Sequence, residues 1–207
     1  MLTRRANASA RGFTLVEMAV VMAVLAFLLL VAAPGFSTWI DNTRIRSAAQ
    51  ALQAGIQTAR MEALRRNQPV SFYLVSLNDP FTLDNSCALS SSSGSWVVSA
   101  SSPTGQCASA PLLAARPIGD AATNVQVSAG HSTDTANMAT LGSAATTLTY
   151  DGLGRVTNAD SAINRIRVTG PRAGAAYVDL MLIVDAGGGV RMCDPRSSIA
   201  STDPRKC

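Results

Sequence analysis

Hydrophobic positions follow two different patterns along the chain, and the change falls near residue 69. Residues 13–33 form an apolar run of 21 residues in which Thr14 and Glu17 are the only polar side chains. As a helix this run extends about 31 Å, the thickness of the hydrocarbon core of a bilayer. We therefore predict a transmembrane helix over residues 13–34. Pro34 is expected to kink it, because proline lacks an N–H and clashes with the preceding turn.

Helical periodicity continues beyond Pro34. Apolar side chains recur at alternating steps of four and three residues, the spacing of one helix face. They are Ile45, Ala49, Leu52, Ile56, Ala59 and Ala63, whereas Arg44, Arg46, Gln50, Gln53, Gln57 and Arg60 fall mostly on other faces. Asn67 and Pro69 end the pattern. The sequence thus predicts an amphipathic continuation of the helix over residues 35–68.

From residue 69 onward the period changes to two, as in β-strands. Stretches that alternate between apolar and polar positions are separated by turn signals such as Asp151-Gly152 and Gly187-Gly188-Gly189. The predicted strands cover residues 70–77, 95–99, 123–129, 146–150, 163–170, 176–184 and 189–193. No second helix of useful length is evident. We predict an α+β fold in which one long helix packs on an antiparallel, β-rich head of residues 69–207.

Charge indicates a membrane orientation more than a nucleic-acid partner. The formal net charge is +4, but Arg4, Arg5 and Arg11 precede the apolar run, and beyond residue 12 the chain has 14 basic and 13 acidic residues. Basic flanks remain in the cytoplasm, so we expect the head on the other side of the membrane. An ordinary secretory signal cut near Ala33 is the alternative, although the run is long for one.

Four cysteines, Cys87, Cys107, Cys193 and Cys207, form no C-x-x-C pair. Their even number and the expected oxidising compartment favour disulfides over a zinc site. Four cysteines allow three connectivities. The sequential one, Cys87–Cys107 and Cys193–Cys207, closes two short loops, each worth about 3 kcal/mol in the chain-entropy model.

Glu17 is the unusual residue of the apolar run. A carboxylate costs about 2.5–3.5 kcal/mol in the middle of a membrane and less near its surface. The run contains no Lys or Arg to pair with it. Cleavage between Gly12 and Phe13 would create a cation, the α-amine of Phe13, that could meet Glu17 of a neighbouring chain in a low-dielectric seam. In the alternative, the carboxylate reaches the membrane surface and has no role.

The stretch RGFTLVEMAVVMAVLAFLLLVAAPGF resembles the class III signal of type IV pilins and type II secretion pseudopilins. The shared features are a basic leader ending at Gly12, the aromatic Phe13, a glutamate five positions after the glycine, and the long apolar helix. The resemblance implies that prepilin peptidase removes residues 1–12 and methylates the Phe13 amine. It also implies that Glu17 pairs with the amine of an adjacent subunit and sets the axial stagger of the filament.

A second motif is similar to that of one subfamily, the GspH/FimT-type minor pilins. Residues 59–63 read ARMEA, Arg65-Arg66 follow, and a strand begins at Val70. This resemblance implies a pilin-like head in which the sheet folds on itself as a small β-sandwich. Taken singly, Arg60 and Glu62 are expected to lie on a solvated helix face.

Enzymatic chemistry finds little support. His131 is the only histidine, and it lies in a polar stretch, residues 130–145, that we expect to be a mobile loop. Ser128, Ser132 and Asp134 are near it only in sequence, which does not indicate a catalytic triad. The glycines at 187–189 are not followed by a helix or a GK[ST] motif, so they predict a turn. We predict no enzyme, no cofactor and no metal site.

The C-terminal tail, GGGVRMCDPRSSIASTDPRKC, carries a cluster of cations in a loop that Cys193–Cys207 would close. Arginines on a constrained loop could contact phosphates. The candidate DNA-binding residues are Arg191, Arg196, Arg205 and Lys206.

In some FimT-type pilins a Gly-Arg-x-Arg motif at this place binds DNA. The corresponding residues 188–191 read GGVR, so Gly189 replaces the first arginine of the motif. Asp194 and Asp203 also dilute the positive charge, and a solubilising tail is the alternative. For a DNA site elsewhere, the next candidates are Arg155, Arg165 and Arg167.

These patterns leave three functions open. The first is a minor pilin that joins a priming complex at the tip of a type IV pilus. The second is the same pilin acting as a DNA receptor for natural transformation, and the third is a type II secretion pseudopilin. The implied partners are other major and minor pilins, prepilin peptidase, the inner membrane and, for a receptor, double-stranded DNA. The expected location is the bacterial inner membrane, with a single pass and a periplasmic head, and then the filament at the cell surface.

Overall fold

The computed structural model describes residues 12–120, 124–171, 177–200 and 202–207, without the side chains of residues 31–36 and 120. The chain divides into two compact units, Met1–Trp39 and Ile40–Cys207. The predicted leader with Arg4, Arg5 and Arg11 lies mostly outside the described residues, as does the side chain of Pro34. The transmembrane segment 13–34 and the kink at Pro34 therefore stay predictions.

One helix, α1, runs from Leu15 to Arg66, so the predicted helix and its continuation form a single element. In the part of the chain that the structure describes, no helix combines the length and apolar character needed to cross a membrane. The helix ends where predicted, because Asn67 adopts a positive φ of 51° and Pro69 follows. From Ile40 onward the amphipathic continuation belongs to the second unit, which also contains the described strands.

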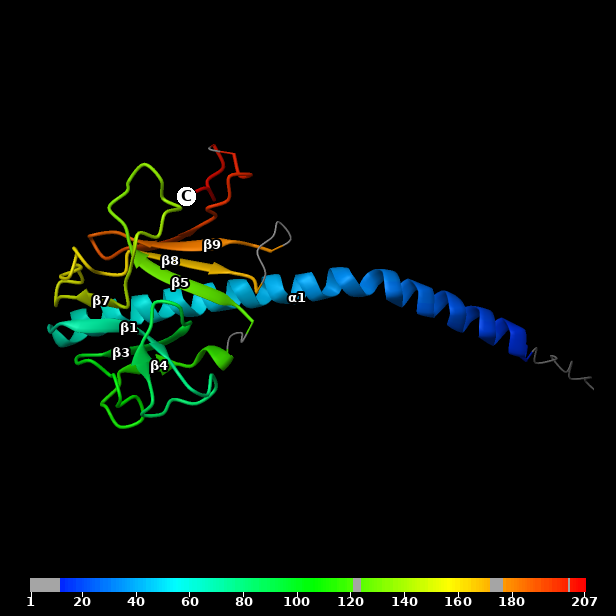
Figure 1. The fold of residues 1–207 in the computed structure, drawn as a ribbon, viewed down its shortest axis with the longest axis horizontal. Helices are drawn as coiled ribbons and strands as arrows, with labels where there is room; N and C mark the ends of the chain where they lie inside the picture. Colours follow the sequence, from blue (N-terminus) through cyan, green and yellow to red (C-terminus); the bar gives the residue numbers. More distant parts are fainter. Residues whose placement is uncertain (1–11, 121–123, 172–176, 201) are drawn as a thin grey trace, which may run out of the picture. The chain divides into compact units, whose positions relative to one another are not determined.

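The strands form two antiparallel sheets (Figure 1). Sheet A has the order β2-β1-β3-β4, with β7 also paired to β1, and sheet B has the order β10-β9-β8-β5-β6. The strands of sheet A are β1 (Val70–Ser76), β2 (Ala88–Leu89), β3 (Ser95–Ser99), β4 (Ala114–Arg116) and β7 (Thr147–Tyr150). Those of sheet B are β5 (Gln126–His131), β6 (Ser143–Ala144), β8 (Arg165–Thr169), β9 (Leu180–Val184) and β10 (Val190–Cys193). A 3-10 turn, η1, covers Ile118–Asp120.

All seven predicted strands are present, within a few residues of their predicted bounds. The short strands β2, β4 and β6 were not predicted. They have two or three residues each, too few to show an alternating pattern. The α+β, pilin-like fold class is confirmed.

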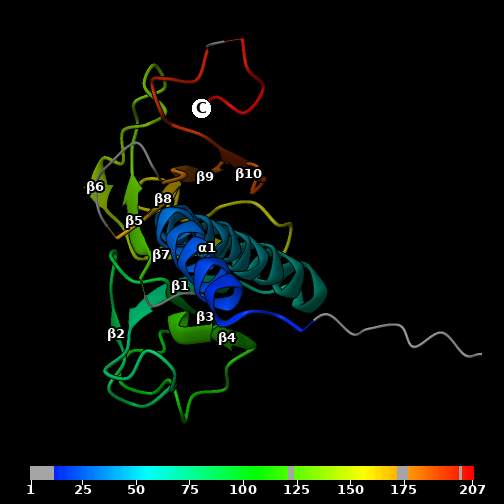
Figure 2. The ribbon, with the colours of Figure 1, turned by 90° about the vertical axis from the view of Figure 1, so that its right-hand side faces the viewer.

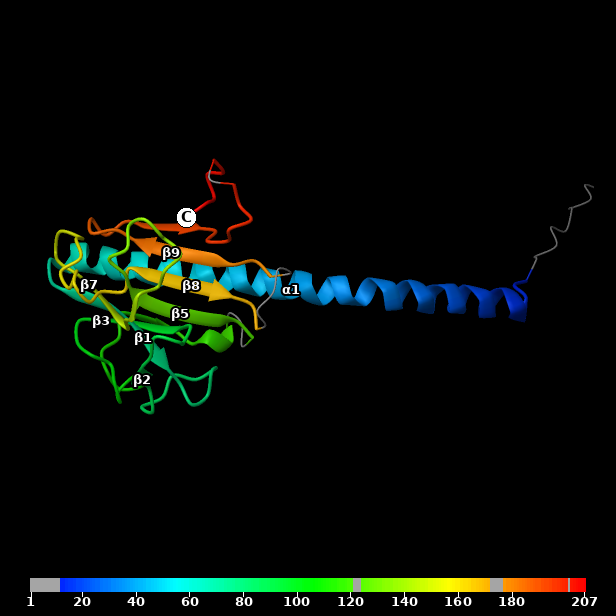
Figure 3. The same cartoon turned by 45° about the horizontal axis from the view of Figure 1, so that its top comes forward.

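The C-terminal half of α1 packs between the two sheets (Figure 2). Its predicted apolar face is buried with the inner faces of both sheets, and Ile45, Ile56 and Ala63 are fully inaccessible. Figure 3 shows β9, β8 and β5 side by side along this part of the helix. Gly55 permits the close approach of sheet A, because a Cβ there would lie 2.8 Å from the rings of Phe72 and Trp96.

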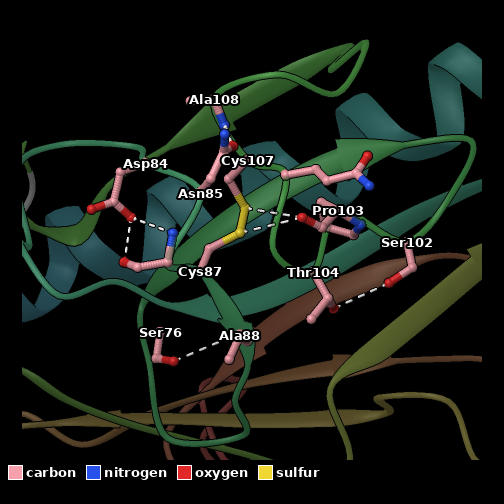
Figure 4. The surroundings of a disulfide bond; sticks show 12 residues. Ser76, Asp84, Asn85, Cys87, Ala88, Ser102, Pro103, Thr104, Cys107 and Ala108 are labelled. Atoms are coloured by element: carbon pink, nitrogen blue, oxygen red, sulfur yellow. Dashed lines mark hydrogen bonds between the residues drawn. A yellow bond between two sulfur atoms is a disulfide. The ribbon is translucent and has the colours of Figure 1, made fainter.

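The outer face of sheet A is covered by the loop that contains the first disulfide. Cys87 and Cys107 are joined and buried, and they pack with apolar side chains of β1 and β3. The carbonyl oxygen of Pro103 lies 3.3 Å from the Cys87 sulfur and 3.6 Å from the Cys107 sulfur (Figure 4). Asn85 accepts a hydrogen bond from the N–H of Ala108. Cys193 and Cys207 are also joined, so the pairing is sequential.

Arg165 organises the loop that follows β5, which the sequence had suggested to be mobile. Its guanidinium donates hydrogen bonds to the carbonyl oxygens of Asp134, Asn137 and Thr140. The side chain is only 3% exposed. Arg165 is therefore not available to DNA, and the loop is tied to the outer face of sheet B.

Arg60 joins helix α1 to two glycine turns. Its Nε donates to the Gly154 carbonyl at 3.0 Å, and its terminal nitrogen donates to the Gly187 carbonyl at 3.1 Å. Gly154 and Gly188 have positive φ angles of 74° and 83°, which glycine adopts without strain. The expectation of a solvated face is wrong for Arg60. Glu62 does lie near solvent, where it pairs with Arg65 and Arg66.

We predict that Arg60→Ala lowers the free energy of unfolding by about 2 kcal/mol, because two carbonyls lose a charged donor. For a chain of this size the midpoint of thermal unfolding should fall by about 4–8 °C. Arg65→Ala is the matched control. Its ion pair with Glu62 is exposed to solvent and should contribute little to stability. Circular dichroism of the oxidised, detergent-solubilised full chain measures both, and equal losses would contradict the role of Arg60.

Candidate functional site

The first candidate site is the start of α1. Gly12, Phe13 and Thr14 are not helical. The N–H of Glu17 donates to the Thr14 hydroxyl at 3.2 Å, and the N–H of Met18 donates to the Thr14 carbonyl at 3.2 Å. Thr14 is thus the N-cap, and Thr14-Leu15-Val16-Glu17 has the sequence of a capping box. Sequence reasoning missed this role, although a threonine three residues before a glutamate is its usual signal.

The predicted cleavage bond lies just before this cap, in open backbone. Phe13 is 79% exposed, and a Cβ built on Gly12 would meet no atom within 4 Å. The fold itself therefore does not require glycine at position 12. Glu17 is exposed in the first turn of α1. It forms no ion pair with any residue that the structure describes.

The second candidate site is the C-terminal loop closed by Cys193–Cys207. Asp194 follows β10 directly and is bonded to the returning tail through its backbone. Its N–H donates to the Arg205 carbonyl at 2.6 Å, and its carbonyl accepts from the Cys207 N–H at 3.1 Å. The disulfide and these two hydrogen bonds fix both ends of the loop.

The sequence Asp-Pro-Arg occurs twice in this loop and folds the same way each time. The N–H and the side chain of Arg196 donate to the carboxylate of Asp194. Arg205 binds Asp203 in the same manner, with a terminal nitrogen 2.7 Å from the carboxylate. Sequence reasoning treated both aspartates only as diluting charges, although the repeat is visible in CDPRSSIASTDPRKC.

Both aspartates have a pKa below the usual value for this side chain. The side chain and backbone N–H of Arg205 lower the pKa of Asp203 to about 2. For Asp194, burial raises the pKa, but the hydrogen bonds and charge of Arg196 outweigh it and the pKa is lowered. A pKa below the unfolded value of about 3.9 makes the ion pair stabilising above about pH 4. The contribution of the Asp203–Arg205 pair is lost as the pH falls towards 2.

These contacts leave most of the predicted DNA-binding cations bound within the loop. Arg196 and Arg205 are bound to carboxylates, and the Lys206 Nζ donates to the Arg196 carbonyl at 2.6 Å. Arg191 is exposed on β10 and forms no ion pair with any described residue. The four predicted cations therefore do not form an open basic surface.

The other predicted cations are also engaged. Arg155 pairs with Asp151 at 3.2 Å, and Arg167 forms a two-pronged ion pair with Asp179. Arg165 is buried, as described above. Restoring the first arginine of the DNA motif at Gly189 would place its Cβ 2.6 Å from the carboxylate of Asp185.

The surroundings of His131 do not form the Ser–His–Asp triad considered for the sequence. Its Nδ1 lies 3.0 Å from the carbonyl oxygen of Ala162, not from a carboxylate. Among the described residues, no group of three or more His, Cys, Asp or Glu side chains could hold a metal ion.

The chain thus combines a non-helical segment, a capped helix start with an acidic first turn, and a helix packed between antiparallel sheets. Residues 48–188 match the family model described as Type II transport protein GspH. Residues 7–33 match the Prokaryotic N-terminal methylation motif. The chain belongs to the GspH family, and the resemblance to GspH/FimT-type minor pilins is confirmed. The matched families are pilin structural proteins, not enzymes.

Two crystal structures of the type IV minor pilin FimU from Pseudomonas aeruginosa are similar in fold. One is 16% identical, with a TM-score of 0.43, and the match covers 71% of this chain and 90% of that chain. The other is 17% identical, with a TM-score of 0.44, and covers 72% and 87%. A comparison with curated proteins finds no relative by sequence.

We predict weak binding of duplex DNA at physiological salt, because carboxylates neutralise two of the four tail cations. Asp203→Asn should release Arg205 and steepen the log–log salt dependence of binding by about 0.9, the value for one added phosphate contact. Arg191→Ala should reduce the slope by a similar amount. A salt titration of fluorescent duplex against the full chain in detergent measures both. Tight wild-type binding that Arg191→Ala abolishes would show that this cluster is a DNA site despite its ion pairs.

Proposed function

We propose that the chain is a minor pilin of a type IV pilus, cut by prepilin peptidase between Gly12 and Phe13 and incorporated in the priming complex at the pilus tip. The observation that carries this proposal is the helix start. Gly12 and Phe13 lie in open backbone directly before the Thr14 cap, within the residues that match the methylation motif.

The geometry gives Glu17 a physical task after cleavage. The new α-amine of Phe13 would lie beside the N-terminus of α1, where the helix dipole already places positive charge. A cation in that position needs an anion, and in hydrocarbon the need is greater because the dielectric is low. Glu17 supplies the acidic group in the first turn. Pairing with the amine of a neighbouring subunit satisfies both charges and fixes the register of the two helices.

The proposed location follows from the two ends of the apolar run. The basic leader keeps the N-terminus in the cytoplasm. The head then lies in the periplasm, an oxidising compartment in which its two disulfides can form. The protein is stored in the inner membrane as a single-pass subunit and later enters the filament with other pilins.

Two alternatives share this fold. A type II secretion pseudopilin would use the same helix start, and the genes next to this one would separate the two filament systems. A DNA receptor is favoured by one observation, the exposed cation of Arg191 on β10, an edge strand of sheet B. The neutralised partners Arg196 and Arg205 make it the weaker candidate.

We predict that Gly12→Val prevents processing, leaving a protein that retains residues 1–12. The reason lies in the peptidase, since a side chain at position 12 meets nothing within this chain. N-terminal mass analysis of the membrane-bound protein tests this, with wild type expected to begin at a methylated Phe13. Wild-type protein that begins after Ala33 would instead show an ordinary signal peptide.

We predict that Glu17→Ala gives a processed, membrane-inserted protein that is absent from filaments. Removing a carboxylate from an apolar helix cannot impair insertion, so the defect must lie in subunit docking. Glu17→Asp is the matched variant, since it keeps the charge and should retain partial incorporation. Immunoblots of sheared filaments and membranes measure both. Normal amounts of Glu17→Ala in filaments would exclude the pairing role.

A further inference from the structure

The edge of sheet B formed by β10 has backbone groups that are free to form hydrogen bonds. Strand β10 is the last strand of the sheet and pairs only with β9. The N–H of Val184, opposite Val190, points the other way and donates to Asn164. Val190 and Val184 are therefore a non-hydrogen-bonded pair, and by alternation so are Met192 and Leu182. The N–H and carbonyl groups of Val190 and Met192 point outward, and no described residue is hydrogen-bonded to them.

The next residue whose backbone groups point outward, Asp194, shows that this edge accepts a backbone partner. Asp194 continues the alternation, and its N–H and carbonyl are bonded to the tail at Arg205 and Cys207. The tail forms a parallel bridge there, between Asp194 and Lys206. It covers this one position and leaves the edge open at Val190 and Met192.

A stripe of side-chain amides follows one flank of α1 beside this edge. Arg46, Gln50, Gln53, Gln57 and Arg60 recur at steps of four and three, so they point within about 40° of one direction. Gln50 and Gln57 are exposed, and Gln53 is half-buried. The amides of these three glutamines form no hydrogen bond with any described residue.

The stripe and the edge are held together at both ends. At one end, Arg60 donates to the Gly187 carbonyl at the turn before β10. At the other, Arg46 lines a cavity together with Met192 and Cys193 at the end of β10. From Arg46 to Arg60 the helix rises about 21 Å, and from Gly187 to Cys193 a strand extends about 20 Å. The glutamines therefore lie alongside Val190–Met192.

The cavity at the Arg46 end favours an acidic side chain. Its volume is about 280 Å³, and it is lined by Arg46, Arg196 and Arg205 together with Asp194 and the apolar Val178, Leu180, Met192 and Cys193. Arg196 and Arg205 are bound to carboxylates of their own. Arg46 is exposed and forms no ion pair with a described residue.

We propose that the edge of β10 and the glutamine stripe of α1 form a strand-addition groove for an extended segment of a different pilin subunit, with an acidic side chain of that segment held at Arg46. The added strand would pair with the outward groups of Val190 and Met192. Its side chains on the helix side would meet the glutamine amides. The inference rests on the proposed function, because a filament brings the heads of different subunits together.

A second copy of this chain is a poor occupant of the groove. Two β10 strands paired edge to edge in antiparallel fashion would bring Arg191 near Arg191, and like charges placed opposite each other in a sheet are destabilising. The chain's own tail is also unsuitable, because it is already fixed at Asp194 by the second disulfide.

The test uses the full chain expressed at native level in its own host. A photoreactive benzoylphenylalanine replaces Gln53 in the groove or, as a control site, the exposed Ser92 before β3. Each is combined with Met192→Pro or Met192→Ala. Proline removes the outward N–H without breaking a bond to β9, whereas alanine loses the same side-chain packing and keeps that N–H. Adducts are isolated by a tag on this chain and the crosslinked peptide is sequenced by mass spectrometry.

We expect the Gln53 probe to give an adduct with one other pilin subunit, through a peptide that contains Asp or Glu. Met192→Pro should lower the yield at least about fivefold, the effect of one lost hydrogen bond, while Met192→Ala retains it. The Ser92 probe should give no such adduct. Three outcomes would contradict the proposed groove. They are an adduct with a second copy of this chain, equal adduct yields in Met192→Pro and Met192→Ala, or no adduct.

The same cultures separate this inference from the function on which it rests. Wild-type chain that is absent from sheared filaments would show that the proposed function has failed. In a different outcome, wild type is present in filaments, and Met192→Pro is present in equal amount and crosslinks equally well. That result would contradict the proposed groove and leave the proposed function intact. Comparable membrane levels of the proline and alanine variants exclude misfolding as the cause of a difference.

Discussion

The head depends on the burial of one face of α1 between two sheets that share no strand pairing. Ile45, Leu52 and Ile56 are almost entirely inaccessible, and each contributes about 1.5–3 kcal/mol through burial. The rest of the face is mostly alanine, and Gly55 lets the rings of Phe72 and Trp96 reach the helix backbone. A helix face with larger side chains would push the sheets apart and separate the two halves of the core.

Periodicity in the sequence was sufficient to predict the helix, its end near Asn67, and every strand of four or more residues. The role of Arg60 could not be predicted in this way, because its acceptors are 94 and 127 residues away. Arg165 is similar: a cation in an alternating strand reads as exposed, yet a loop folds over it and supplies three carbonyls. The Asp-Pro-Arg turns differ, since their partners are local and the repeat itself was visible.

At the helix start, the roles of Gly12, Phe13 and Glu17 stay predictions from the sequence, whereas the capping role of Thr14 was overlooked. In the tail, sequence reasoning noted the cations and missed that Arg196, Arg205 and Lys206 are bound within the loop. A basic isoelectric point of about 9.2 thus gives little indication of the surface. Most of the head arginines that the structure describes are bound to carboxylates or carbonyls of the same chain, and few of them remain to attract an anionic partner.

The separation in sequence between Arg60 and its two acceptors has a consequence for how the protein reaches its native state. Helix α1 is local and forms early, whereas sheet B pairs residues near 126 with residues near 169 and closes with β10. Contacts between residues so far apart in the sequence are slow to form. Until the two sheets have formed, the apolar face from Ile45 to Ala63 stays uncovered. The chain is therefore most exposed to proteases and chaperones before the β9–β10 turn reaches Arg60.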